Sequence, residues 1–253
     1  MAPGRTTLKH TRVYIDGYDM SGSSRALGPL VWTLDEQDLT CISDAVKGSL
    51  MGHATLGVGA INGVMDNTAS SGMHVNFNAS GVKRAVMLPI GIRAEPAQGD
   101  PVYMGEFEQQ GYQYEAPYVN IQFALPSSSN ATLLYDKPWG YLLHAKGEET
   151  AVNTAIGIDD NAASSALGGY MMYQVFSGDG TATIKVQDAA TNLNGSFSDL
   201  SGGTSGSIDC TTPKYGIVAI GKTATVRRYL RWQIVLGTAT TVTFALSFVR
   251  ATY

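Results

Sequence analysis

The sequence predicts a mostly β protein with two sandwich-like lobes, long hairpins and one flanking α-helix. Apolar and polar residues alternate with a period of two along most of the 253 residues, and clusters of Gly, Ser and Thr separate these runs. Charged residues make up only 15%, against about 25% in ordinary soluble domains. A surface with so few charges is either small or largely covered by other subunits.

Five runs in the first half are typical of β-strands. They lie near Val13 and begin at Ala54, Val82, Asp100 and Pro117. In the last of these runs the alternation predicts a core face made by Val119, Ile121 and Phe123. Asn120 and Gln122 are then expected on the opposite face.

Residues 33–47 are expected to form the one long helix. Thr33 and Glu36 match a capping box, acidic residues fill the first turn, and Lys47 lies in the last turn before Gly48. Apolar residues recur at helical spacing, at Leu39, Ile42 and Val46. A second, short helix is expected within residues 68–77.

The stretch 126–140 interrupts the strand pattern. It is rich in Ser, Asn and Pro at its start, which predicts a linker or a long loop. We therefore place a boundary near residue 130, with a first lobe over 1–130 and a second β-sandwich lobe over 131–253.

The second lobe contains two predicted hairpins, each made of two alternating runs and a short turn. The first joins the run 170–176 to Ala182, Ile184 and Val186 through a turn at Gly178 and Gly180. The second is expected to bury two rows of apolar residues over a shared core, namely Leu230, Trp232, Ile234 and Leu236, then Val242, Phe244, Leu246 and Phe248.

The segment Gly216–Thr223 reads GIVAIGKT and matches the phosphate-binding loop pattern G-x-x-x-x-G-K-[ST]. Such a loop needs flexible backbone after a strand, with Lys-Thr opening a helix. Here the middle positions are Ile217, Val218, Ala219 and Ile220. Because β-branched residues resist the special loop angles and the following residues alternate like a strand, we interpret the match as accidental.

Other candidates for chemistry are weak. His10, His53, His74 and His144 lack metal-ligand spacing, the triplet 159–161 (Asp-Asp-Asn) lacks the periodicity of a calcium loop, and the Gly/Ser stretch from Gly202 is not a nucleophile elbow. Among the carboxylates, which include Asp16 and Asp19, Glu106 and Glu108 share a face of one predicted strand. No apolar residues are expected to bury one of these two carboxyls and so give it a different pKa from the other. Both are therefore expected to be solvated or pore-facing. The sequence predicts no catalytic residue, no cofactor and no metal site.

The charge pattern also argues against nucleic-acid recognition. The formal net charge is −4, and the longest basic run is Arg227-Arg228. Alternation places Trp232 in the core and directs Tyr229 and Arg231 outward, which favours a sheet-face or subunit-contact role for this arginine. Two distant cysteines and the absence of an apolar N-terminal stretch predict synthesis in a reducing cytoplasm.

Three stretches carry a resemblance to a known family. VYIDGYDMSG, the early capped helix that ends AVKG, and the strand AINGVMDNTASSGMHVNF resemble the major tail tube proteins of long-tailed, non-contractile (siphovirus-type) bacteriophages. The resemblance covers roughly residues 10–125. In that family the inner strands of neighbouring subunits join into one β-barrel that conducts DNA. The second half is similar to sandwich modules of phage structural proteins, including two-lobed tube subunits.

The resemblance implies a non-enzymatic structural protein of the virion tail, made in the bacterial host cytoplasm, that polymerises as stacked rings. The second lobe then either lines the pore, which gives trimeric rings, or decorates the exterior of hexameric ones. The implied partners are copies of itself, the tape-measure protein, tail terminator and baseplate proteins, and genomic DNA that passes without specific binding. The pore-facing candidates are Glu106, Glu108, Asn120 and Gln122, whose acidic and amide groups would not hold a polyanion.

Other functions stay open at this stage. A capsid decoration protein or a tail adhesin would share the sandwich architecture, and a P-loop ATPase would depend on Lys222. A carbohydrate-binding module would need exposed aromatic residues in a groove. The one cluster of that kind is Tyr112, Tyr114 and Tyr118, for which we favour packing or loop contact.

Overall fold

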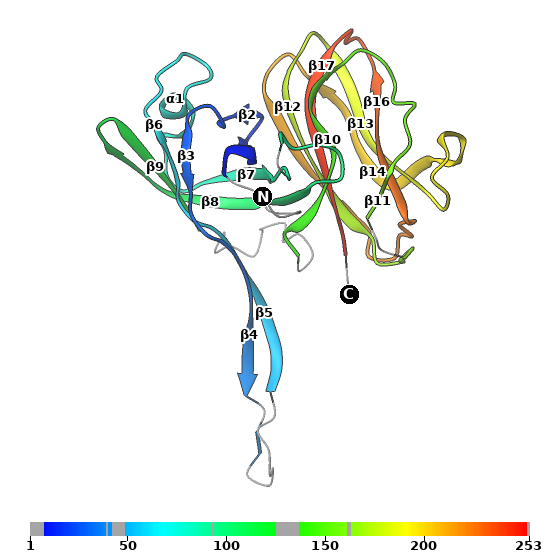
Figure 1. The fold of residues 1–253 in the computed structure, drawn as a ribbon, viewed down its shortest axis with the longest axis horizontal. Helices are drawn as coiled ribbons and strands as arrows, with labels where there is room; N and C mark the ends of the chain where they lie inside the picture. The colour runs from blue at the N-terminus through cyan, green and yellow to red at the C-terminus, as the bar shows by residue number, and fades with distance from the viewer. Residues whose placement is uncertain are drawn as a thin grey trace.

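The computed structural model describes residues 8–38, 40–41, 49–92, 94–124, 137–160 and 163–251. It confirms a mostly β fold of curled antiparallel sheets in a sandwich-like arrangement (Figure 1). The elements in chain order are η1 (Leu8–His10), β1 (Tyr14–Ile15), β2 (Tyr18–Asp19), β3 (Ser24–Leu27), β4 (Leu30–Asp38), β5 (Ser49–Val58), β6 (Ile61–Val64), α1 (Met73–Phe77), β7 (Val82–Pro89), β8 (Pro101–Glu115), β9 (Tyr118–Ala124), β10 (Trp139–Glu149), β11 (Ile158–Asp159), β12 (Gly169–Gly178), β13 (Thr181–Ala189), η2 (Asn194–Ser196), β14 (Ser198–Asp209), β15 (Lys214–Ile220), β16 (Tyr229–Leu236) and β17 (Val242–Arg250).

One large sheet runs through both halves of the chain. Its 11 strands follow the order β15-β12-β17-β10-β8-β7-β1-β2, and β9, β6 and β3 branch from β8. The halves join where Trp139 of β10 pairs with Tyr103 of β8. The sheet curls so far that β2 contacts β12 and β15 contacts β7. A second sheet has the order β11-β16-β13-β14, and β4 pairs only with β5.

Three clusters of buried apolar residues fill the spaces between these layers. One lies between the second sheet and the strands β10, β12 and β17, and it includes Trp232 and Phe244. Another lies under α1 and contains Phe77 together with the predicted core residues Val119, Ile121 and Phe123. The third fills the curl of the large sheet and contains residues from both halves, such as Met87 and Met172. The alternation therefore identified the core faces of both halves correctly.

The two predicted hairpins of the second lobe are wrong. β12 and β13 belong to different sheets, and so do β16 and β17. Each pair is an arch, in which the chain crosses from one sheet to the other. Ile184 of β13 and Phe244 of β17 therefore lie in different sheets and pack into one shared core. Alternation and turn residues cannot separate an arch from a hairpin, because both bury one face of each run against a shared core.

The helix predicted at 33–47 is also wrong where the structure describes it. Residues 30–38 form β4, which pairs in register with β5, for instance Thr33 with Thr55. Residues 39 and 42–48 lie outside the described residues. The capping box is a local signal, and an isolated helix of this length without a core to pack on gains little stability. The helix that the structure does contain, α1, lies within the short segment expected at 68–77.

The boundary expected near residue 130 lies in 125–136, outside the described residues, so the division into 1–130 and 131–253 stays a prediction. Among the described helices, none is long and apolar enough to cross a membrane.

Candidate assembly surfaces

The four pore-facing candidates lie on one face of the same sheet region. Glu108 pairs with Ala124, and after a bulge at β8 Gly111 pairs with Gln122 and Gln113 pairs with Asn120. Because Glu106 precedes Glu108 by two residues, it shares this face. The opposite face holds the buried residues under α1. The strand pairing therefore places all four side chains on one face of the sheet. We call this face, which carries Glu106, Glu108, Asn120 and Gln122, the polar face.

The polar face continues across neighbouring strands. Asn62 of β6 pairs with Asn120, which in turn pairs with Gln113, so three carboxamide residues form a row across β6, β9 and β8. A hollow of about 390 Å³ lies over this row. Asn120 Oδ1 is buried in it and has no hydrogen-bond partner among the described residues. Farther along β8, Glu106 lies 4.0 Å from the Lys83 ammonium.

This part of the sheet has two free edges among the described residues. β3 pairs with β6 on one side only. β7 pairs with β8 only up to Gln109, so residues 111–115 of β8 have a partner on the β9 side alone. An unpaired strand edge presents backbone N–H and C=O groups that template the addition of another strand. Strands β3, β6, β9 and the end of β8 thus form a four-stranded unit, here called the inner sheet, open on both sides.

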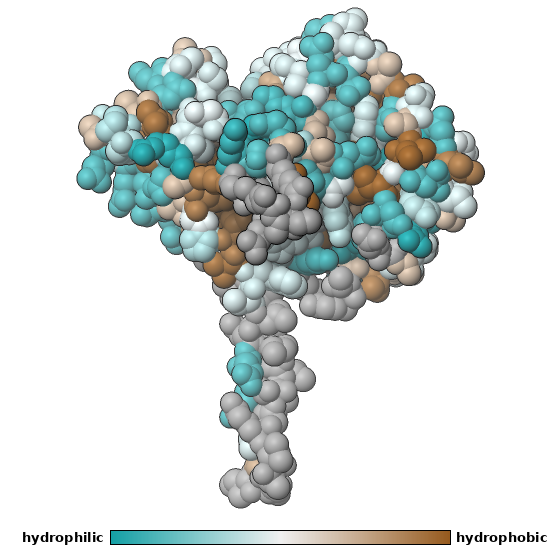
Figure 2. Space-filling view, in the orientation of Figure 1, coloured by the Kyte–Doolittle hydropathy of each residue, from teal (hydrophilic) through white to brown (hydrophobic). Residues whose placement is uncertain are grey.

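The β4–β5 hairpin is a second exposed surface. It projects well beyond the body of the molecule, and its two strands pair only with each other (Figure 1). Trp32 on β4 is 39% exposed. On the rest of the face shown in Figure 2, hydrophobic residues occur in small groups among hydrophilic ones. The hairpin and the free strand edges therefore stand out as contact surfaces.

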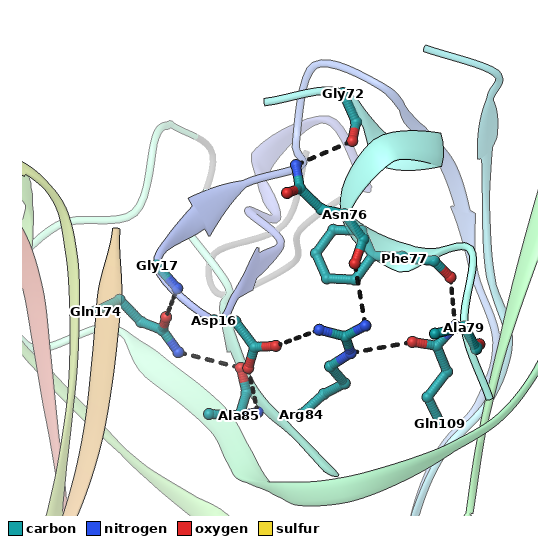
Figure 3. Close-up of polar contacts among 10 residues, drawn as sticks. All are labelled: Asp16, Gly17, Gly72, Asn76, Phe77, Ala79, Arg84, Ala85, Gln109 and Gln174. Carbon is teal, nitrogen blue, oxygen red and sulfur yellow. Dashed lines mark hydrogen bonds and ion pairs between the residues drawn. The ribbon is translucent and has the colours of Figure 1, made fainter. Parts of the chain in front are cut away.

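A largely buried polar cluster links β7, β8, α1 and the β1–β2 turn to strand β12 (Figure 3). The Arg84 guanidinium donates to the Asp16 carboxylate at 2.9 Å, to Gln109 Oε1 at 3.1 Å and to the Asn76 carbonyl of α1 at 3.0 Å. Gln109 Nε2 donates to the Phe77 carbonyl at 2.6 Å. Because every arm of the guanidinium is bonded, this arginine ties β7, β8, α1 and the β1–β2 turn together.

The same cluster reaches β12. Gln174, fully buried on that strand, accepts from the Gly17 amide and donates to the Ala85 carbonyl at 3.2 Å. Burial raises the pKa of Asp16, an effect that the Arg84 and Ala85 hydrogen bonds oppose. Gly17 has a φ of +85° and packs against the backbone of Lys214, where no side chain would fit. Hydrogen bonds of Gln174 therefore connect β12 to the β1–β2 turn and to β7.

The segment that matches the phosphate-binding loop is strand β15, as expected. Its residues from Gly216 to Ile220 pair with β12, and the next element after the turn at Lys222 is strand β16. The backbone amides of this segment are thus directed along a β-ladder, and the geometry is not that of a loop that surrounds a phosphate.

The tyrosines considered for carbohydrate binding do not form one surface. Tyr112 pairs with Ile121 and Tyr114 with Val119, so both lie on the face opposite Asn120. Tyr118 lies on the polar face, with the Arg25 guanidinium 4.2 Å from its ring centre.

Arg231 does not face solvent, contrary to the sequence-based expectation. It is only 5% exposed, because loops before β11 and after β13 cover it. Its guanidinium donates to Gln187 Oε1 and to the Ala155 carbonyl, each at 2.8 Å. Strand periodicity gave its sheet face correctly but carries no information about loops that fold over that face.

The other candidate residues are dispersed. His74 bonds the Tyr112 hydroxyl, His144 bonds Glu149 in the second lobe, and Asp159 pairs with Arg228. Asn161 lies outside the described residues.

No family model and no curated protein matches the chain. Among solved structures, it is similar to the Dit protein of phage SPP1, described as a paradigm of the hub adsorption apparatus in phages that infect Gram-positive bacteria. The two are 10% identical over 94% of this chain and 99% of the Dit chain, with a TM-score of 0.32. Because a TM-score this low does not establish a common fold, the function has to follow from the chain's own surfaces.

Proposed function

We propose that the chain is a structural subunit of a phage tail tube, which polymerises as stacked rings around a bore. The observation that carries the proposal is the inner sheet, which is open at both edges and has one polar and one core face. Copies that pair the β3 edge of one subunit with the free end of β8 in the next would continue this sheet around a ring. Closure of a sheet into a barrel removes the hazard of exposed edges.

In this arrangement the polar face lines the bore. It offers carboxylates at Glu106 and Glu108 and carboxamides at Asn120 and Gln122. Carboxylates and neutral carboxamides do not bind phosphates as a row of lysines or arginines would. DNA would therefore pass along this surface without specific binding. Genomic DNA and a tape-measure protein are the proposed occupants of the bore.

The second lobe then decorates the outside. It joins the inner sheet through β10, which pairs with residues 101–103 at the other end of β8. Its two sheets already close on each other around a core of their own. One inner sheet per copy favours rings of six subunits over rings of three.

The β4–β5 hairpin would join successive rings, since it projects well beyond the body of the molecule (Figure 1). Tail terminator and baseplate proteins would cap the two ends of the stack.

Electron microscopy of the purified, untagged protein at rising concentration tests the proposal. We expect hollow tubes or stacked rings with an open bore. A protein that stays dispersed and instead binds preformed capsids would overturn the proposal in favour of a decoration role. Retention on glycans without polymerisation would favour an adhesin.

Cysteine labelling tests which face lines the bore. In a Cys41→Ser background, Glu108→Cys should resist a bulky maleimide in tubes but react in the unassembled subunit. Asp199→Cys on the second lobe, where the carboxylate side chain is 50% exposed, is the matched control and should react in both states. Rapid labelling of Glu108→Cys in intact tubes would place the polar face outside.

A further inference from the structure

A groove of about 270 Å³ lies along β3. One wall is the strand itself, from Ser24 to Leu27, and the other is the segment from Leu8 to Val13 that leads into β1. Since only one edge of β3 is paired within the described part of the chain, the groove adjoins backbone able to accept a further strand.

The groove is cationic. Three basic residues line it: Lys9, Arg12 and Arg25. Arg12 is neutralised by Glu95 and also donates to the Lys9 carbonyl at 3.2 Å. Lys9 and Arg25 have no carboxylate partner among the described residues, and the Arg25 guanidinium lies over the Tyr118 ring. Arg25 also lines the neighbouring hollow together with Glu115 of the same copy, and these two described residues form no ion pair with each other. Lys9 and Arg25 thus both lack an ion pair within the described part of the chain.

A strand end with a free edge and one terminal carboxylate exists on the same molecule. The free end of β8 terminates at Glu115, which is exposed and has no ion-pair partner among the described residues. The edge that β7 leaves unpaired begins after Gln109. One copy thus carries both a cationic groove beside an open strand and an acidic strand end with an open edge. Such heterologous surfaces generate rings or filaments when copies join head to tail.

We propose that this groove receives the end of β8 from a neighbouring copy, with Glu115 of that copy placed against Lys9 and Arg25. The inference rests on the proposed function, because it names the contact that closes each ring. Backbone pairing along β3 supplies the affinity, and the charges fix which strand end enters and in which register. A nucleic acid would suit the two cations but would leave the edge of β3 unpaired.

A charge-reversal experiment tests the contact. The variant Lys9→Glu/Arg25→Glu has an acidic groove and an acidic strand end, and Glu115→Lys has a basic groove and a basic end. Each variant alone should form at least about tenfold less polymer than the wild type, because like charges meet at every contact between subunits. An equimolar mixture should polymerise again, since the two variants alternate around the ring. Sedimentation and electron microscopy measure the polymer, and thermal melting checks that each variant folds.

The control is Glu148→Lys, which makes the same charge change at an exposed position of β10 and should polymerise normally. If the wild type never polymerises, the proposed function fails, and this contact fails with it. If the wild type polymerises and the charge variants do so equally well, only the inference is overturned. A mixture that stays unassembled overturns it too, as does loss of polymer in the control. Binding of short DNA duplexes that the groove variant abolishes, with polymerisation intact, would assign the groove to nucleic acid.

Discussion

The glycine that begins the phosphate-loop match has a packing role. Gly216 pairs across strands with Tyr173, whose ring lies over it, and a methyl group at this position would collide with the ring and its hydroxyl. An aromatic side chain that covers a cross-strand glycine is a known device for stabilising a sheet. Around Gly221, the second glycine of the match, there is open space. The first glycine of the match is therefore explained by packing under Tyr173, and the second by its place at the turn that follows β15.

This difference predicts the effect of two matched substitutions. Gly216→Ala should lower the free energy of unfolding by about 1–3 kcal/mol, because Tyr173 must leave its position. Gly221→Ala should change it by no more than about 0.5 kcal/mol. Chemical denaturation of both variants measures the difference. A nucleotide-dependent rise in melting temperature that both substitutions abolish would contradict the strand interpretation.

At the same scale, the sequence predicts side chains that obey a local period and misses those positioned by distant loops. Asn120 and Gln122 were placed on one face by alternation alone, and the register agrees. The row that they form with Asn62 and Gln113 needed the strand order, which no local pattern contains. The burial of Arg231 needed two loops that lie far from it in sequence.

At the scale of elements, the turns that cross between sheets depend on side-chain caps. Asp179, in the connection from β12 to β13, accepts from the Thr240 hydroxyl and from the backbone amides of Thr240 and Thr241. These two threonines lie in the connection from β16 to β17. One carboxylate therefore fastens both arches together, and its hydrogen bonds lower its pKa to about 2.

The lowered pKa predicts an acid-sensitive contribution to stability. The carboxylate titrates near 3.9 in the unfolded chain and near 2 in the folded one. Its stabilising effect is thus complete above about pH 4–5 and is lost as the pH falls through about 2. Asp179→Asn should be less stable than the wild type at pH 7, with a difference that shrinks between pH 5 and pH 2. Thermal melting across this range measures it, and a constant difference would contradict the linkage.

Element type was predictable where burial and period agreed, as in β8, β9, β16 and β17. It was not predictable at residues 33–38, where a helix cap and helical charges coincide with a strand. There the pairing with residues 49–58 decides, and pairing is a non-local property.

For the whole molecule, the third core and the polar cluster argue for one cooperative unit. Residues of both predicted lobes, among them Met104, Leu142 and Tyr170, share that core. Gln174 also bonds across from β12 to the β1–β2 turn and β7. Neither half can open without exposing this shared apolar surface.

We therefore expect a single unfolding transition for the unassembled chain. Differential scanning calorimetry should give a calorimetric enthalpy equal to the van't Hoff enthalpy. Two resolved transitions, one for each lobe, would show that the shared core contributes little coupling.

The position of β17 has a consequence for biogenesis. This strand follows all the others in sequence, yet it lies between β10 and β12 near the middle of the large sheet. β10 and β12 have no ladder partner between them until β17 has been synthesised, so this part of the large sheet forms only after the chain has been made as far as residue 250. Such long-range pairing makes folding slow. A chain that stops before β17 also lacks the strand that joins β10 to β12, so we expect it not to complete the large sheet.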